Sequence, residues 1–303
     1  MANHIKSFVA RSPTLAAVLV MLIGMLLFTA NDAVGKWLTG SYSIGQLLFI
    51  RSVIALAVLA PFVWRTGLRA LIAIDRPWTF LVRILLTVAD SFAFYYAVSL
   101  QPLADVMTYW LAAPIYVAAF APLLLGERVG WRRWSAIAFG FLGVLVALEP
   151  SPAMFTPGAI VSLAGSLAFG FVLLSARSLR STSGLTMIFW QSFGGAAFGL
   201  LTLPFSWTSP PPNQWPAFAA LGLLAMLAHV AVNWAFKHAD AATVAPLQYT
   251  QLFWAIVFGW MFFDDLPSGA KIIGAAMIIG SGLFIFFRER QLGKGDKVLP
   301  AIP

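Results

Sequence analysis

The chain has 303 residues, of which 60% are hydrophobic and only 10% are charged, and its net charge is +8. This composition lies outside the range of soluble globular domains, and the basic residues sit in short turns between apolar runs rather than on a patch that would bind nucleic acid. Because the chain contains no cysteine, disulfides, a thiolate nucleophile and cysteine-ligated metals are excluded.

The apolar runs number about ten, and most are close to the roughly 20 residues that cross a bilayer core. They cover residues 14–38, 45–64, 77–98, 104–125, 134–149, 157–176, 185–206, 215–236, 241–263 and 270–287. Turn-forming stretches such as Pro267-Ser268-Gly269 separate them, and no connection is long enough for a soluble domain. The sequence therefore predicts an all-α integral membrane protein with ten transmembrane helices.

The first run also has features of a secretory signal peptide, since a basic start precedes it and the small residues Thr29-Ala30 lie within it. Its apolar stretch is too long for a signal-peptide core, and the bulky Phe28 would stand three residues before the cleavage point. We expect a transmembrane helix here.

Basic residues mark alternate connections between the runs. Fifteen of the 19 lysine and arginine residues lie in the two terminal segments or in every second connection: Lys6, Arg11, Arg65, Arg69, Arg76, Arg128, Arg132, Arg133, Arg177, Arg180, Lys237, Arg288, Arg290, Lys294 and Lys297. The other connections hold none, so the positive-inside rule predicts that this set, and with it both termini, is cytoplasmic. We expect a multi-pass protein of the inner, or plasma, membrane.

The two halves of the chain repeat one unit. Tyr95–Leu148 aligns with Val232–Phe286 at a shift of 137 residues, and Arg51-Ser52 aligns with Gln191-Ser192 at a shift of 140. Each unit has five helices, an odd number, so the second unit enters the membrane from the opposite side. Inverted repeats of this kind are typical of secondary transporters.

The first unit contains Ala112-Ala113-Pro114, an apolar run, Leu125-Gly126-Glu127-Arg128 and a closing helix with Gly140 and Gly143. This pattern resembles the EamA domain of the drug/metabolite transporter superfamily. The resemblance covers essentially the whole chain, twice. It implies a first EamA repeat over 14–149, a second over 157–287 and a cytoplasmic tail over 288–303.

The resemblance implies carrier-type transport and leaves the substrate and direction open. Relatives include exporters of amino acids and other metabolites, and importers of vitamins or of S-adenosylmethionine. In relatives, helices three, four, eight and nine surround the central cavity. The second unit departs from the pattern, with Gln251 at the position of Pro114 and Phe263-Asp264-Asp265 in place of Gly126-Glu127-Arg128, so the halves are expected to contribute unequally.

Four charged residues lie inside predicted spans, where an isolated charge costs about 2.5 to 3.5 kcal/mol on insertion scales. Asp32 and Arg51 each lie six residues from the outer end of their spans. Both are therefore roughly 9 Å deep on the same side of the membrane. We expect them to form an ion pair that is either structural or part of a gate. Arg83 and Asp90 lie two turns apart on one face of the third span, where both can line one path.

Uncharged polar residues and rings complete the candidate binding site. Amide or imidazole side chains one turn apart suggest a hydrogen-bonding wall, and aromatic residues near Asp90 suit a modest organic solute with an apolar part. The candidates are Asp90, Phe94, Tyr96, Tyr109, Trp110, Trp190, His229, Asn233, Gln248 and Gln251. For each amide the competing interpretation is a helix–helix hydrogen bond, and for each ring it is plain packing.

Other function classes lack their motifs in this sequence. There is no HExxH, GxSxG or GxxxxGK[ST] pattern, so neither an enzyme nor direct ATP drive is expected. No cofactor or metal is expected, and the expected partners are a small-molecule substrate and the lipid bilayer, with the chain a monomer or weak homodimer. We predict a secondary transporter of a small organic metabolite, such as an amino acid, that exports by alternating access. The alternative is an importer of a vitamin or nucleoside-like metabolite, of the riboflavin or S-adenosylmethionine type. The alternative that is not a carrier is a channel or a membrane scaffold.

Overall fold

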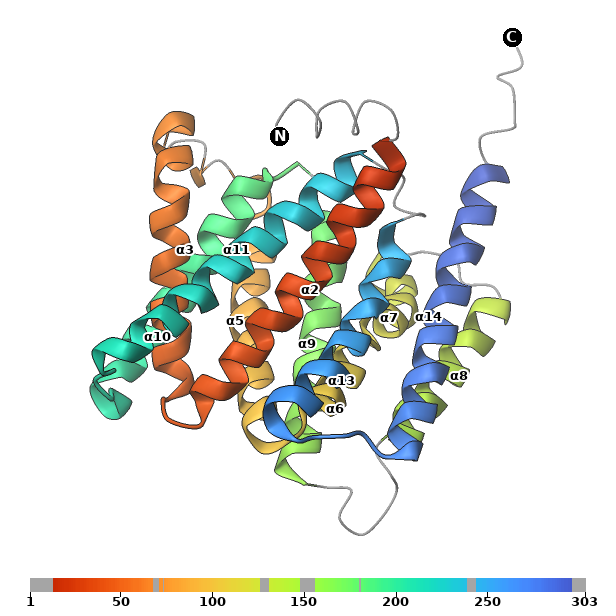
Figure 1. Cartoon of the computed structure of the whole chain (residues 1–303). Coiled ribbons are helices and arrows are strands. Elements are labelled where there is room, and N and C mark those ends of the chain that lie inside the picture. Colours follow the sequence, from red (N-terminus) through yellow and green to blue (C-terminus); the bar gives the residue numbers. More distant parts are fainter. Residues whose placement is uncertain are drawn as a thin grey trace.

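The computed structural model describes residues 13–67, 71–72, 74–125, 131–147, 156–179, 181–238 and 244–295. These residues form an almost entirely helical bundle (Figure 1). The helices are α2 Pro13–Thr39, α3 Ile44–Thr66, α5 Pro77–Leu100, α6 Leu103–Trp110, α7 Ala113–Leu125, α8 Trp131–Ala147, α9 Pro157–Ser178, α10 Gly184–Ser206, α11 Trp215–His238, α13 Thr250–Phe263 and α14 Gly269–Gly295, with short 3-10 turns η2 Pro212–Gln214 and η3 Ala245–Tyr249.

These elements make ten spans, because α6 and α7 together form the fourth and η3 and α13 the ninth. Among the described residues, seven helical stretches are long and apolar enough to cross a membrane, and the apolar parts of α8 and α14 are shorter. The prediction of an all-helical membrane protein with ten spans is confirmed.

The helices pack across the two halves in a symmetric pattern. The most extensive contacts join α2 with α11, α8 with α14, α3 with α10 and α5 with α9. In the repeat, α2 corresponds to α9 and α5 to α11, so the first and last of these contacts are counterparts of each other. The other two each pair a helix with its own counterpart. This is the arrangement of two halves related by a two-fold axis.

Glycine allows a close contact of backbones between α8 and α14. A Cβ on Gly143 would lie 2.9 Å from the Gly274 carbonyl oxygen, and a Cβ on Gly274 would lie 2.6 Å from the Gly143 carbonyl oxygen. Because backbone lies on both sides, only residues without a side chain fit, as in other membrane helix pairs built on small residues.

The fourth and ninth spans are broken, which corrects the expectation of continuous helices over 104–125 and 241–263. Pro114 has no N–H to bond the Trp110 carbonyl, so α6 ends at Trp110 and α7 begins at Ala113. In the described part of the ninth span, the 3-10 turn η3, at Ala245–Tyr249, precedes α13. A shift of 137 places η3 on residues 108–112, so both halves interrupt their fourth helix at the same place.

The ends of the bundle differ from the expected boundaries in one respect. Helix α14 continues to Gly295, so the described part of the expected tail is helical; residues 296–303 lie outside the described part. The first turn of α2 and the last turn of α14 lie at the same end of the bundle, the upper end in Figure 1.

Candidate functional site

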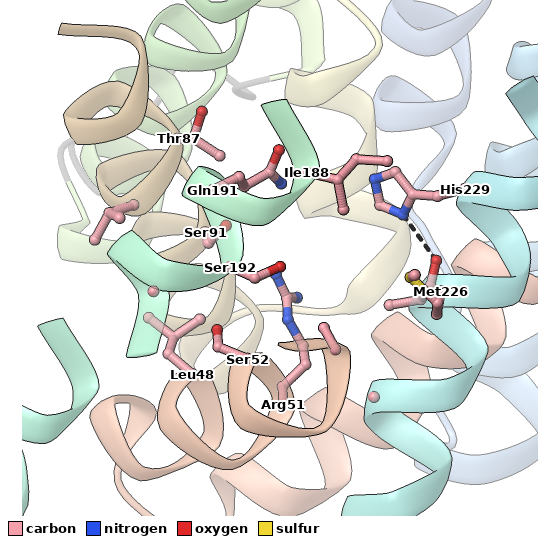
Figure 2. Close-up of a pocket in the computed structure, with 15 residues that line it drawn as sticks. Leu48, Arg51, Ser52, Thr87, Ser91, Ile188, Gln191, Ser192, Met226 and His229 are labelled. Carbon is pink, nitrogen blue, oxygen red and sulfur yellow. Dashed lines mark hydrogen bonds between the residues drawn. The ribbon is translucent and has the colours of Figure 1, made fainter. Parts of the chain in front are cut away.

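A cavity lies near the middle of four helices, α3, α5, α10 and α11 (Figure 2). It holds about 570 Å³ of space free of protein atoms, part of it open to the outside. Its walls combine hydroxyl, amide, imidazole and guanidinium groups with aliphatic side chains. The lining residues are Leu48, Arg51, Ser52, Ala55, Thr87, Val88, Ser91, Ile188, Gln191, Ser192, Gly195, Gly222, Ala225, Met226 and His229.

The cavity lies where the two repeats meet. On α3 and α10, every lining residue of one helix aligns with a lining residue of the other at a shift of 140. The pairs are Leu48 with Ile188, Arg51 with Gln191, Ser52 with Ser192 and Ala55 with Gly195. The cavity is therefore built from equivalent faces of the two halves, and its polarity differs mainly at Arg51 and Gln191.

Equivalent caps set where these two faces begin. Ser43 caps α3, accepting a hydrogen bond from the Gln46 amide at 3.3 Å, and Ser183 caps α10, accepting from the Thr186 amide at 3.0 Å. Ser43 and Ser183 are also 140 residues apart. Because an N-cap fixes the first turn of a helix, these serines give α3 and α10 the same register toward the cavity.

A polar network joins Arg51 to the centre of the bundle. Arg51 donates from Nη1 to the Tyr95 hydroxyl at 2.8 Å, and its guanidinium lies 5.5 Å from the centre of the Tyr95 ring. Asn31 Nδ2 donates to the same hydroxyl at 3.4 Å and to Asp32 Oδ1 at 3.1 Å. Tyr95 is 1% exposed, so this network is sealed within the protein on that side.

Asp32 and Arg51 therefore share one network, as expected from their depth, but the link between them is indirect. Among the described residues, the side-chain ion pairs within 4 Å are Lys36 with Asp265 and Lys271 with Asp105. Arg51 interacts with Asp32, and also with Asp90, only at longer electrostatic range. In this conformation the hydroxyl of Tyr95 occupies the position that a direct partner would take.

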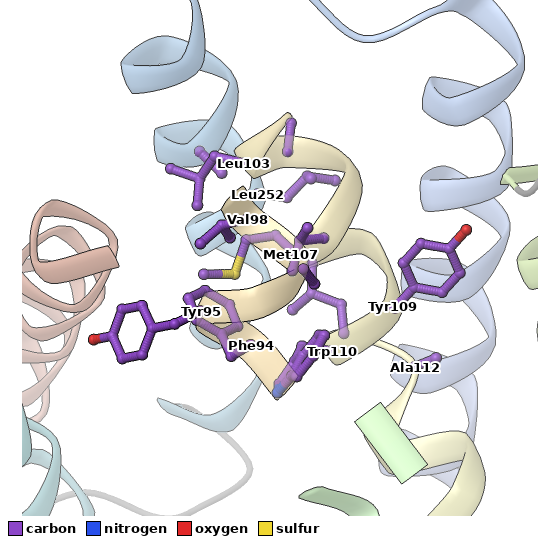
Figure 3. Close-up of a cluster of buried hydrophobic side chains, with 14 of the residues drawn as sticks. Phe94, Tyr95, Val98, Leu103, Met107, Tyr109, Trp110, Ala112 and Leu252 are labelled. Atoms are coloured by element: carbon purple, nitrogen blue, oxygen red, sulfur yellow. The ribbon is translucent and has the colours of Figure 1, made fainter. Parts of the chain in front are cut away.

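Asp90 lies in a small aromatic cluster beside this network. Trp110 donates from Nε1 to Asp90 Oδ1 at 2.7 Å, and the rings of Trp110 and Phe94 meet edge to face at 5.1 Å. Figure 3 shows Phe94 and Trp110 packed together and Tyr109 directed away from them. The structure thus brings together three of the candidate residues and separates Tyr109 from them.

The remaining aromatic candidates lie elsewhere. Tyr96 is exposed and stacks on Phe92, with ring centres 6.1 Å apart. Trp190 donates from Nε1 to the Leu71 carbonyl at 2.9 Å, which ties α10 to the segment after α3. Neither residue lines the cavity.

Of the expected amide and imidazole wall, His229 lines the cavity. Its Nδ1 lies 2.7 Å from the Ala225 carbonyl oxygen and its ring packs edge-on against Phe28 at 4.8 Å. Asn233 and Gln248 are exposed and Gln251 is half-buried. This cavity lies between the second, third, seventh and eighth spans, whereas the expected site also drew on the fourth and ninth spans.

Arg83 is used in a different way from Asp90. Its Nη1 donates to the Val172 carbonyl and to Ser175 Oγ, the latter at 2.9 Å. Both partners lie on α9, so the Arg83 side chain links α5 to α9 by hydrogen bonds. In this conformation Arg83 does not line a common path with Asp90.

Several cavity residues are absent from the expected site: Ser52, Thr87, Ser91, Gln191 and Ser192. The alignment of Arg51-Ser52 with Gln191-Ser192 was the available indication, because polar pairs at matching positions of an inverted repeat point to its axis. Within the described part of the chain, no cluster of three His, Asp or Glu residues could hold a metal ion.

At one end of the bundle, called the paired end, ion pairs and hydrogen bonds join the two halves. Lys36 Nζ binds Asp265 Oδ2 at 2.7 Å, and Lys271 Nζ binds Asp105 Oδ2 at 2.5 Å. Each pair joins a residue of the first repeat to one of the second. Nearby, Gln46 exchanges two hydrogen bonds with the backbone of Thr208, at 2.7 and 3.0 Å. The paired end is the lower end in Figure 1.

The chain matches the EamA-like transporter family twice, over residues 15–148 and 156–287. It is similar to an S-adenosylmethionine uptake transporter of Rickettsia felis, with 24% identity over 89% of this chain and 92% of the relative. It is 28% identical to a riboflavin transporter of Rhizobium johnstonii, over 95% of this chain and 97% of the relative. A pseudopaline exporter of Pseudomonas aeruginosa is 23% identical over 87% of this chain and 93% of the relative.

A solved structure shares the fold. It superposes with a TM-score of 0.61 and 20% sequence identity, and the match covers 91% of this chain and 98% of the other. At this identity the likeness concerns the arrangement of helices alone.

Proposed function

Since the chain belongs to the EamA-like transporter family, we propose that it is a secondary carrier that moves a small organic metabolite across the plasma membrane by alternating access. The observation that carries this proposal is the cavity between equivalent faces of the two repeats, near the middle of its four helices. Inverted repeats give a carrier two related conformations around a central site, one open to each side.

In this proposal the paired end faces outward and both termini are cytoplasmic, in accord with the basic residues of the alternate connections. The Lys36–Asp265 and Lys271–Asp105 pairs join the two halves there, and in the proposal they close the outer path. Release of the substrate outward requires these contacts to separate while the helices at the opposite end close.

The proposed binding site combines the cavity with the charged network beside it. Arg51 and His229 line the cavity, and Asp90 lies near it in contact with Trp110 and Phe94. Tyr96, Tyr109, Trp190, Asn233, Gln248 and Gln251 remain candidates for contacts in another conformation.

Transport in proteoliposomes tests the proposal directly. A panel of labelled metabolites is followed in both directions, with and without a pH gradient and without ATP. Net transport of at least one solute is expected from protein-loaded vesicles and not from empty ones. Absence of transport across the panel, by protein that is folded and inserted, would contradict the carrier proposal.

Asp90→Asn tests the role of the buried carboxyl. Asparagine keeps the size of the side chain and can still accept from Trp110 Nε1, so the fold is expected to persist. Transport driven by a pH gradient or by counter-substrate is expected to fall at least tenfold, as for loss of a group that exchanges a proton or holds a cation. Unchanged transport with an unchanged pH profile would remove Asp90 from the mechanism.

Export is the proposed direction, and import is the second candidate. Import is favoured by the relatives that are named uptake transporters, such as the S-adenosylmethionine transporter of Rickettsia felis. The ratio of efflux to uptake in vesicles of known protein orientation separates the two.

A further inference from the structure

The charge on the walls of the cavity is unevenly distributed. Among the described residues that line it, Arg51 is the one permanently charged side chain, and Asp32 and Asp90 are not part of the walls. At the equivalent position of the other repeat the charge is replaced by the neutral amide of Gln191. A site built from two related faces is therefore positive on one side only.

The guanidinium of Arg51 has unused hydrogen-bonding capacity. Arginine carries five N–H donors, and within the described part of the chain its side chain donates one hydrogen bond, to the neutral hydroxyl of Tyr95. No carboxylate oxygen among the described residues lies within 4 Å of it. Asp32 and Asp90 act on the Arg51 guanidinium only at longer electrostatic range, so its remaining donors are open to an acceptor on a bound solute.

The surroundings of Arg51 suit an anionic group at one end of a longer molecule. Figure 2 shows the guanidinium reaching into the cavity toward Ser192 and Gln191, with Ser52 and Ser91 close by. These hydroxyl and amide groups can donate to the same anion. Further along the cavity, Ile188 and Met226 offer apolar contact.

We propose that the cavity binds a solute bearing a carboxylate, and that Arg51 is the residue that holds it. This inference rests on the proposed transport function and names the substrate class of that site. A carboxylate matches the planar fork of a guanidinium and accepts two parallel hydrogen bonds, the strongest neutralisation available to Arg51 in this cavity. Tyr95 positions the guanidinium from behind and leaves its remaining donors to the solute.

The test compares matched solutes and matched variants in proteoliposomes. The probes are labelled α-amino acids and simple carboxylic acids, the amide and the decarboxylated amine of each, and a set of organic phosphates. Transported probes are expected to carry the carboxylate, with the corresponding amides at least tenfold slower. Arg51→Gln is expected to reduce transport of acids at least tenfold, and Arg51→Lys to retain more of it, because lysine keeps the charge and loses the fork.

A second variant guards against misfolding of Arg51→Gln. Gln191→Glu places a carboxylate on the facing helix, where it can occupy the Arg51 guanidinium, so it should also slow the acids at least tenfold. Equal transport of acids and their amides, preference for phosphates, or full acid transport by Arg51→Gln would overturn the proposal. Transport of amines or amides alone would overturn it while sustaining the carrier function, whereas no transport of any probe by folded wild-type protein would overturn both.

Discussion

At the scale of single residues, the charges in the membrane were visible in the sequence and their partners were not. Asp32, Arg51 and Asp90 stand out because they interrupt apolar runs. Their contacts depend on Tyr95 and Trp110, which look like ordinary packing residues until the helices are assembled. Lys36 and Lys271 likewise looked like residues at helix ends, because their acidic partners lie 229 and 166 positions away.

The Asp32 and Arg51 side chains should stabilise the fold as a unit. Removing one charge leaves the other buried without its counter-charge, a state that costs on the order of 3 kcal/mol. We expect Asp32→Asn and Arg51→Gln each to lower the thermal unfolding midpoint in detergent, and the double variant to lose less than the sum of the two. Tyr95→Phe is the matched control for the connecting hydroxyl, with an expected cost of about 1.5 to 3 kcal/mol. A double variant that loses as much as the sum of the two single variants, or more, would argue against the coupling.

At the scale of helices, span positions follow closely from hydrophobicity, whereas interruptions within spans do not. Helix α3 begins within one residue of the expected start and α5 at the expected residue, because apolar runs end where polar turns begin. The break after Trp110 depends on one missing N–H at Pro114. The turn η3 occurs at the equivalent place although Gln251 replaces that proline. The backbones of the two halves are therefore more similar than their local sequences indicate.

The contact of α8 with α14 gives a stability prediction with an internal control. Gly274→Ala should destabilise the protein by about 1 to 3 kcal/mol, because its Cβ would press on the backbone of Gly143 and Ala147. Gly280→Ala, on the same helix, meets no atom within 4 Å and should be neutral or slightly stabilising. The measurement is the unfolding midpoint of each variant in one detergent. Equal midpoints for the two variants would mean that the helices separate easily at this contact.

At the scale of the whole molecule, the repeat predicted the topology and could not predict which conformation is populated. Five helices per unit require an inverted second unit, and the pairing of α3 with α10 and of α8 with α14 agrees with that requirement. The contacts at the paired end join residues that are far apart in the sequence and lie on different halves. The location of the cavity on α3 and α10 likewise follows from their packing, which hydrophobicity does not specify.

Membrane orientation can be measured by single cysteine substitutions in this cysteine-free chain. Arg132→Cys should react with an impermeant maleimide only from the cytoplasmic side, and Ser209→Cys and Ser268→Cys only from the outside. Wild-type protein, which has no thiol, supplies the background. Labelling of all three from one side would contradict the predicted orientation.

The ion pairs of the paired end should control access to the cavity. In a Ser192→Cys background, adding Asp265→Asn or Lys271→Gln should increase labelling from the paired end several-fold, because each change removes a contact between the halves. Exchanging the charges with Lys36→Asp and Asp265→Lys together should restore part of the protection. Labelling rates that ignore all of these changes would show that the closure depends on packing alone.

The Asp105–Lys271 pair also has a consequence for the response of the protein to its surroundings. At a shift of 137, the equivalent positions in the sequence are Ala242 and Trp134, whose side chains cannot form such a pair. Lys271 and Asp265 keep 29% and 28% of their side-chain surface exposed, so dissolved ions can weaken their attraction to their partners. The salinity of one compartment, and not of the other, should then shift the resting balance between the two conformations.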